Sequence, residues 1–470
     1  MCLGHPPGHR LGDACFLTTA CDGRHPRLIA GGFSFMMNPR SSEHTHSHSD
    51  FMAKFRKIRA WLPKALPFGA LAAVVLWCAT GAIAPPLEAQ TGATPAPARA
   101  QSSTQFESLS RRAMEALDAD RLQEAIPLLR KALALNPRWA EGWWSLGTTY
   151  YDQGSYAEAE LAFQHVVAID PKHGTAHAFL GLCEFELGDD KAALRDIEAG
   201  KDLGTDVDPQ LRTVVFFHEG ILLERAGRFV AAEMPFASLC LGGTSGADVV
   251  RGFGMAALRM PGTQFPAAGS EAATVAEQVG RAACAAAQKD FDSARLQMTA
   301  ITSAYPHFPY VHYAFGRVLL DASDIPGAVA EFKREIDEGH DRVLPMLQIA
   351  ACEYKVDPAA GLPYAQQAVA LAPQLPFAHY LLGLLLANTG DEAKAIPELE
   401  IARRAFPKDL KVYWSLASAY ARTGRSQDAA KARAEIGRLS HNAAHPEDAA
   451  SDPQNTPIDV TDAAEKVTER

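Results

Sequence analysis

The stretch AEGWWSLGTTYYDQGSYAEAELAFQHVVAIDPKH, residues 140–173, decides the fold because it predicts two helices joined by a turn. Gly154 ends the first helix, since glycine adopts a left-handed backbone without steric cost. Ala159 and Phe163 form the facing stripe of a second helix, which Pro171 stops because proline has no amide donor. One face of the first helix is made by residues at steps of three and four, namely Trp143, Leu146, Gly147 and Tyr150.

Glycines and prolines of the same kind recur at intervals of 34 positions along the chain. The repeated pairs are Pro137 and Pro171, Gly154 and Gly188, Pro373 and Pro407, and Gly390 and Gly424. A pattern of Trp, Leu-Gly, Tyr, Ala, Phe and Pro with this period resembles the tetratricopeptide repeat. The resemblance implies stacked helix pairs in a right-handed superhelix, with the first helix of each pair lining a concave groove.

We therefore predict an all-α protein, a right-handed tetratricopeptide superhelix (an α-solenoid) of about nine helix–turn–helix repeats. Stacking buries a continuous core that no single repeat could bury alone. The repeats fall into two sub-arrays, residues 106–260 and 271–439, which a loop at 261–270 separates. One further helix is expected over residues 247–260, at the end of the first sub-array. Other positions that define the repeats are Gly181, Gly188, Gly383, Gly390, Ala395 and Pro407.

The N-terminal region indicates export. Residues 1–51 have no helical or strand period and read as a disordered or wrongly assigned leader. Residues 52–89 have a basic start and then an apolar run at 66–84, which is typical of a signal peptide cleaved after Ala89. The same run is long enough to be a retained membrane anchor. Both alternatives place the rest of the chain outside a bacterial cytoplasm, in the periplasm or envelope.

Two further segments are expected to lack a fold. Residues 90–105 are rich in Ala, Pro, Thr and Ser, so we predict a flexible linker. Residues 440–470 form an acidic tail with few large apolar side chains. Such a segment cannot bury enough surface to offset its ordering entropy, so disorder is expected.

Composition limits the function. The formal net charge of −10 argues against nucleic acid as the main partner. Cys183, Cys240, Cys284 and Cys352 lie far apart, without metal-ligand spacing. We expect them to be free, buried thiols. A disulfide between neighbouring repeats is the alternative.

No catalytic constellation has a convincing spacing, so we expect no enzyme, no cofactor and no metal. His177, His312 and His379 each occupy the position that Trp143 holds in its own repeat. A shared place in the repeat favours packing over metal coordination.

The concave surface is the candidate binding site. The residue directly after the Trp143 position points toward the groove, and Tyr151 and Arg317 lie further along the same helices. Aromatic rings there suit a partner peptide or helix, although they could equally pack against the next repeat. These rings are Trp144, Phe217, Tyr313, Tyr380 and Trp414.

Some family members grip C-terminal carboxylates with Lys and Asn at these groove positions. The matching positions in this chain hold Trp144, Thr148, Tyr380, Leu384, Trp414 and Ser418, so that clamp is absent.

The resulting hypothesis is a non-catalytic scaffold in the bacterial cell envelope that binds a peptide or helix of another protein. One alternative is a membrane-anchored accessory subunit of an envelope assembly or secretion complex, attached through residues 66–84. Another is a regulatory partner of an enzyme. The sequence names neither the partner nor the oligomeric state.

Overall fold

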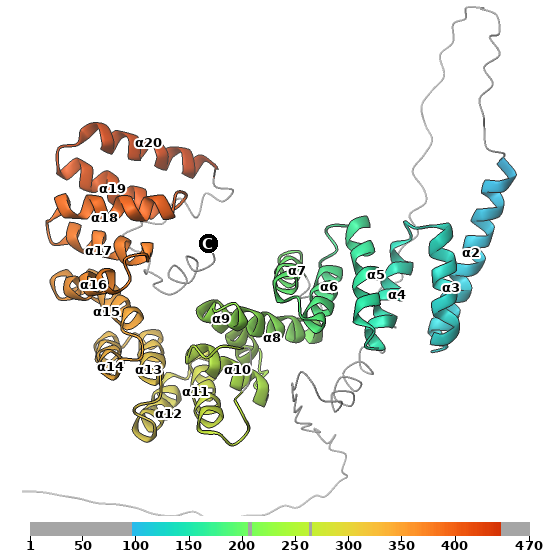
Figure 1. The fold of residues 1–470 in the computed structure, drawn as a ribbon, viewed down its shortest axis with the longest axis horizontal. Coiled ribbons are helices and arrows are strands. Elements are labelled where there is room, and N and C mark those ends of the chain that lie inside the picture. Colours follow the sequence, from blue (N-terminus) through green and yellow to red (C-terminus); the bar gives the residue numbers. More distant parts are fainter. Residues whose placement is uncertain (1–95, 205–208, 263–265, 443–470) are drawn as a thin grey trace, which may run out of the picture. The chain divides into compact units, whose positions relative to one another are not determined.

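The computed structural model describes residues 96–204, 209–262 and 266–442, and every regular element within them is an α-helix (Figure 1). The first ten helices are α2 (Ala96–Asp118), α3 (Leu122–Leu135), α4 (Ala140–Asp152), α5 (Tyr156–Ile169), α6 (Gly174–Leu187), α7 (Asp190–Asp202), α8 (Pro209–Arg225), α9 (Phe229–Leu241), α10 (Ala247–Ala257) and α11 (Glu271–Ala287). The remaining ones are α12 (Phe291–Ala304), α13 (Val311–Asp321), α14 (Ile325–Glu338), α15 (Val343–Val356), α16 (Pro358–Leu371), α17 (Pro376–Asn388), α18 (Glu392–Ala405), α19 (Leu410–Arg422) and α20 (Ser426–Asn442).

Each described helix packs against the next one along the chain, which confirms the prediction of an all-α solenoid. Nine helix pairs correspond to the predicted repeats, and α10 is the additional helix expected after the fourth pair. The pairs are α2 with α3, α4 with α5, α6 with α7, α8 with α9, α11 with α12, α13 with α14, α15 with α16, α17 with α18, and α19 with α20.

The glycines at the helix crossings explain how two helices of one repeat approach so closely. A Cβ atom added to Gly147 would lie 2.8 Å from the ring of Phe163. Phe163 is fully buried, so its ring has no free space into which to move. Gly181 and Gly383 have the same relation to residues of their partner helices, at 2.8 and 2.7 Å. Gly154 has a φ of +71°, as expected for the residue after the first helix.

Helices α10 and α11 cross even more closely. A Cβ on Gly254 would lie 1.7 Å from the carbonyl oxygen of Ala276, and one on Gly280 would lie 1.7 Å from that of Val250. Only hydrogen atoms fit between the two backbones at this point. The helix that follows the fourth pair is therefore packed directly against α11. Residues 261, 262 and 266–270 between them are not helical.

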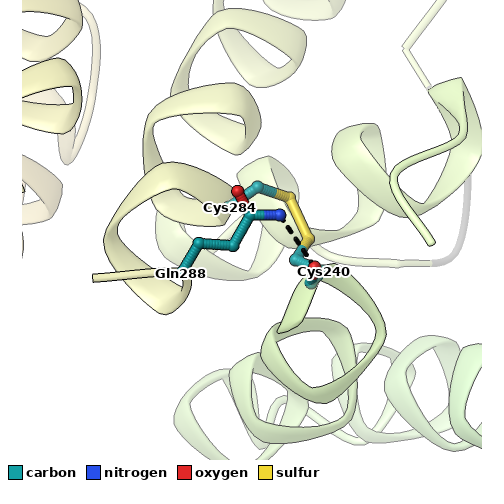
Figure 2. The surroundings of a disulfide bond; sticks show 3 residues. All are labelled: Cys240, Cys284 and Gln288. Carbon is teal, nitrogen blue, oxygen red and sulfur yellow. Dashed lines mark hydrogen bonds between the residues drawn. A yellow bond between two sulfur atoms is a disulfide. The ribbon is translucent and has the colours of Figure 1, made fainter. Parts of the chain in front are cut away.

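The expectation of four free cysteines is wrong for two of them. Cys240 at the end of α9 and Cys284 in α11 form a disulfide across a sequence separation of 44 residues (Figure 2). The Gln288 amide donates a hydrogen bond of 2.8 Å to the Cys240 carbonyl oxygen. The disulfide joins two helices that are not neighbours in the chain, because α10 lies between them in sequence. Cys183 and Cys352 are free.

Helix α2 begins at Ala96, so residues 96–105 are helical and not the flexible linker expected there. The physical reason is composition, since Ala, Arg and Gln favour helices and Pro97 falls in the first turn, where a missing amide donor costs nothing. The predictions for residues 1–51, 52–89, 90–95 and 443–470 lie outside the described residues. Ser440, His441 and Asn442, which were expected to belong to the disordered tail, are the last residues of α20. Among the described helices, none is long and apolar enough to cross a bilayer.

Candidate interaction surface

The position of Trp143 has a structural role that recurs along the chain. Its side chain reaches back to the carbonyl oxygen of a proline six residues earlier, at the end of the preceding repeat. This contact joins consecutive repeats, so residue types as different as Trp, His and Tyr can serve there. The pairs are Trp143 with Pro137 (2.9 Å), His177 with Pro171 (3.2 Å), His379 with Pro373 (3.0 Å) and Tyr413 with Pro407 (3.1 Å).

The histidines at this position also pair with a carboxylate of the second helix of the same repeat. The acidic partner follows each histidine by 19 residues, and the ring Nδ1 makes the contact. These pairs hold the two helices of a repeat together. They are His177 with Asp196 (2.8 Å), His312 with Glu331 (2.7 Å) and His379 with Glu398 (2.5 Å). No group of three or more His, Cys, Asp or Glu side chains among the described residues is arranged to hold a metal ion.

The structure separates the predicted groove residues into two kinds. Four of them are buried, with relative exposures between 1% and 7%, namely Tyr151, Phe217, Tyr313 and Tyr380. Their rings pack inside the chain, which is the alternative to lining a groove. Trp414 differs, because 47% of it is exposed on α19.

Trp144 lies between these extremes and is partly buried. Its ring stacks on His173 at a centroid distance of 5.3 Å and meets Phe163 and Phe179 edge-on at 5.5 Å. The ring therefore fills the junction between the second and third pairs, α4–α5 and α6–α7.

Tyr313 and Arg317 belong to one buried polar cluster on α13. Arg317 forms an ion pair of 3.2 Å with Glu233 of α9, 84 residues earlier in the chain. Burial alone would lower the pKa of Arg317, but the Glu233 carboxylate raises it above its ordinary value. The Gln348 amide of α15 donates to the Tyr313 hydroxyl at 3.2 Å. Gln348 stands at a position where leucine is expected, and its amide makes this hydrogen bond instead.

Buried acidic side chains in α6 and α8 were not anticipated from the sequence. Glu184 is 5% exposed, and burial, together with the neighbouring Asp196, raises its pKa to about 7. Burial likewise raises the pKa of Glu219, although the Lys201 ammonium bonded to it acts in the opposite direction. The only sequence signal is an acidic residue inside an otherwise apolar helical run, such as GLCEFEL at 181–187.

Among the residues predicted to line a groove, Trp414 on α19 is the one that is exposed in the structure. Lys411, Trp414, Ser418 and Arg422 follow one another at steps of three and four residues, so they form one stripe along the helix. We call these four residues the α19 stripe. The Arg422 guanidinium is 59% exposed and pairs with Glu392 at 2.8 Å. No ion pair holds the Lys411 ammonium among the described residues.

Stacked two-helix units of about 34 residues, closed by glycine and proline at fixed places, define a helical-repeat solenoid. A sequence model of the tetratricopeptide repeat matches residues 110–173, 355–409 and 393–443. These matches confirm the resemblance recognised from the sequence, and over these residues the chain is similar to tetratricopeptide repeats.

Solved structures of other repeat proteins superpose weakly on the chain. A tetratricopeptide repeat protein from Parabacteroides merdae has 15% identity and a TM-score of 0.27, covering 60% of this chain and 99% of that one. Yeast Tom70 has 12% identity and a TM-score of 0.29, covering 72% and 85%. YrrB, described as having an unusual peptide-binding site, has 17% identity and a TM-score of 0.21, covering 50% and 86%. At such TM-scores the superpositions do not bear on function. The sequence matches no curated protein.

Proposed function

We propose that the protein is a non-catalytic scaffold that binds a segment of another protein along the α19 stripe. Tetratricopeptide arrays support such a role because stacked repeats create extended surfaces for binding. The observation that carries the proposal is the exposure of Trp414. At the equivalent position the rings of Phe217, Tyr313 and Tyr380 are buried, whereas 47% of Trp414 faces solvent. Exposed tryptophans are typical anchors of protein interfaces.

The test is capture of a partner from an envelope extract by the full chain and by the variant Trp414→Ala. We expect the substitution to abolish capture of one defined polypeptide without changing helicity, because nearly half of Trp414 faces solvent. Leu296→Ala is a matched control, since Leu296 is an apolar residue of α12 with 73% exposure. Capture that survives Trp414→Ala, or is lost equally in Leu296→Ala, would refute the role of the stripe.

We propose further that the protein acts outside the cytoplasm. The Cys240–Cys284 disulfide supports this location, since disulfides persist in oxidising compartments and are rare in a reducing cytosol. The segment at 52–89 supports it independently, as its basic start and apolar run are typical of export signals. N-terminal sequencing of the protein from an envelope fraction tests the proposal. A start at Gln90 would indicate cleavage, a retained run at 66–84 would indicate an anchor, and recovery from the cytosol alone would contradict export.

A second candidate role is an accessory subunit of a membrane-bound envelope complex. The retained form of the apolar run at 66–84 would favour it, since the chain would then be anchored beside membrane components. The same extract distinguishes the two roles. Co-purification of several membrane proteins would favour the accessory subunit, and a single soluble polypeptide would favour the scaffold.

A further inference from the structure

The last repeats carry a charge opposite to that of the whole chain. From Arg403 to Arg438 there are nine lysines and arginines against three acidic residues, a net charge of +6. The chain as a whole has a formal net charge of −10. Several of these cations, Lys411 included, have no ion pair among the described residues. Arg403 and Arg422 pair with Glu400 and Glu392, which precede this stretch, so the positive charge is only partly compensated. The charge that remains around Lys411 favours an acidic ligand.

The chain itself contains an acidic segment directly after this region. Residues 443–470 hold seven acidic residues and two basic ones, a net charge of −5. Ile458 and Val460 lie within the segment, and Asp452 and Asp462 lie on either side of them. The segment thus offers apolar side chains for an exposed ring and carboxylates for the cations around it.

The last described helix, which precedes this segment in the chain, ends close to the beginning of α19. Leu410 in the first turn of α19 and Leu439 near the end of α20 pack against the same apolar cluster, which contains Tyr413 and Ile436. The end of α20 therefore lies beside the beginning of α19, where Lys411 is found.

The segment is also long enough to follow the stripe. Lys411 and Arg422 are separated by 11 residues of helix, or about 17 Å. The 28 residues of the segment span about 90 Å when extended. A tethered segment of this length reaches the stripe at an effective concentration on the order of millimolar, so even weak contacts suffice.

We propose that residues 443–470 dock on the α19 stripe, with Ile458 and Val460 against Trp414 and the acidic side chains against Lys411 and its basic neighbours. The docked segment shields the stripe until a partner displaces it. The shielding role rests on the proposed function, whereas docking is testable without any partner.

Zero-length carbodiimide cross-linking of the full chain, followed by peptide mass spectrometry, tests the docking. The reagent joins a lysine to a carboxylate in contact with it. We expect Lys411 to be joined to acidic residues of 443–470, with a yield that falls at least threefold in 1 M NaCl and in Trp414→Ala. Lys431 is the control, because it is 78% exposed and closer in sequence to the segment. Equal labelling of Lys431, or no adduct at Lys411, would overturn the proposal.

A second variant separates the proposal from the proposed function. Replacing the seven acidic residues of 443–470 by Asn and Gln should raise partner capture several-fold, because the stripe is then free. Capture that stays unchanged in this variant would overturn the shielding role. The proposed scaffold function would still be supported if the separate variant Trp414→Ala abolished capture. Loss of capture in the charge-neutral variant would also contradict shielding, since the segment would then be part of the partner site.

Discussion

The disulfide between α9 and α11 gives the sharpest prediction for stability. The variant Cys240→Ala/Cys284→Ala removes a cross-link that closes a loop with a sequence separation of 44 residues. The loop-closure entropy of such a cross-link corresponds to about 4 kcal/mol at 25 °C. Because each helix packs on its neighbours, the loss should be greatest in α9, α10 and α11, which the disulfide encloses or joins.

Hydrogen exchange and urea unfolding, each with and without a thiol reductant, measure the effect. We expect reductant to lower the stability of α9 to α11 in the natural sequence by about the amount lost in the double variant, and to leave the double variant unchanged. Cys183→Ala is a suitable control, because Cys183 is buried but forms no disulfide. The stability that this variant loses should therefore be the same with and without reductant. If the reductant changes neither the hydrogen-exchange rates nor the urea unfolding of the natural chain, the reasoning is refuted.

Three further predictions concern packing and charge. Gly254→Ala should destabilise the chain by about 1–3 kcal/mol, because its Cβ would lie 1.7 Å from the Ala276 carbonyl oxygen. Gly437→Ala has open space around the new Cβ and should be neutral or stabilising, and thermal unfolding measures both variants. Glu184 has a pKa raised from 4.5 to about 7, so the folded state binds its proton more tightly and loses stability as pH rises through that interval. Glu184→Gln should remove this part of the pH dependence. If the unfolding midpoint of the variant changes between pH 4.5 and 7.5 by as much as that of the natural chain, this prediction is contradicted. Gln348→Leu and Tyr313→Phe should show a coupling of about 1 kcal/mol in a double-mutant cycle, and strict additivity would mean that their hydrogen bond contributes nothing.

The local part of the fold was predictable because its signals are local. Gly154 takes a positive φ after α4, and Gly147 lies against Phe163, as the spacing within one repeat requires. Each helix pair follows from a period of 3.6 residues and a turn residue, and neither depends on the rest of the chain.

The features that were missed depend on contacts between distant segments. The Cys240–Cys284 pair is close because α9 and α11 pack against each other and against α10, an arrangement that the spacing of the cysteines does not reveal. Tyr313 is buried in a cluster that includes the ion pair of Arg317 with Glu233, 84 residues apart in sequence. A period in the sequence places a ring on the face of a helix, but another helix decides whether that face is covered.

Photo-cross-linking from position 414 tests the central claim most directly, because it reports what touches the α19 stripe in the cell. A benzophenone side chain would replace Trp414 in one variant of the full chain and Leu296 in a second one. We predict that position 414 gives one defined adduct heavier than the chain alone and that position 296, at 73% exposure, gives none. Adducts of the same pattern at both positions, or no heavier species from position 414, would contradict an interaction scaffold that binds its partner through α19.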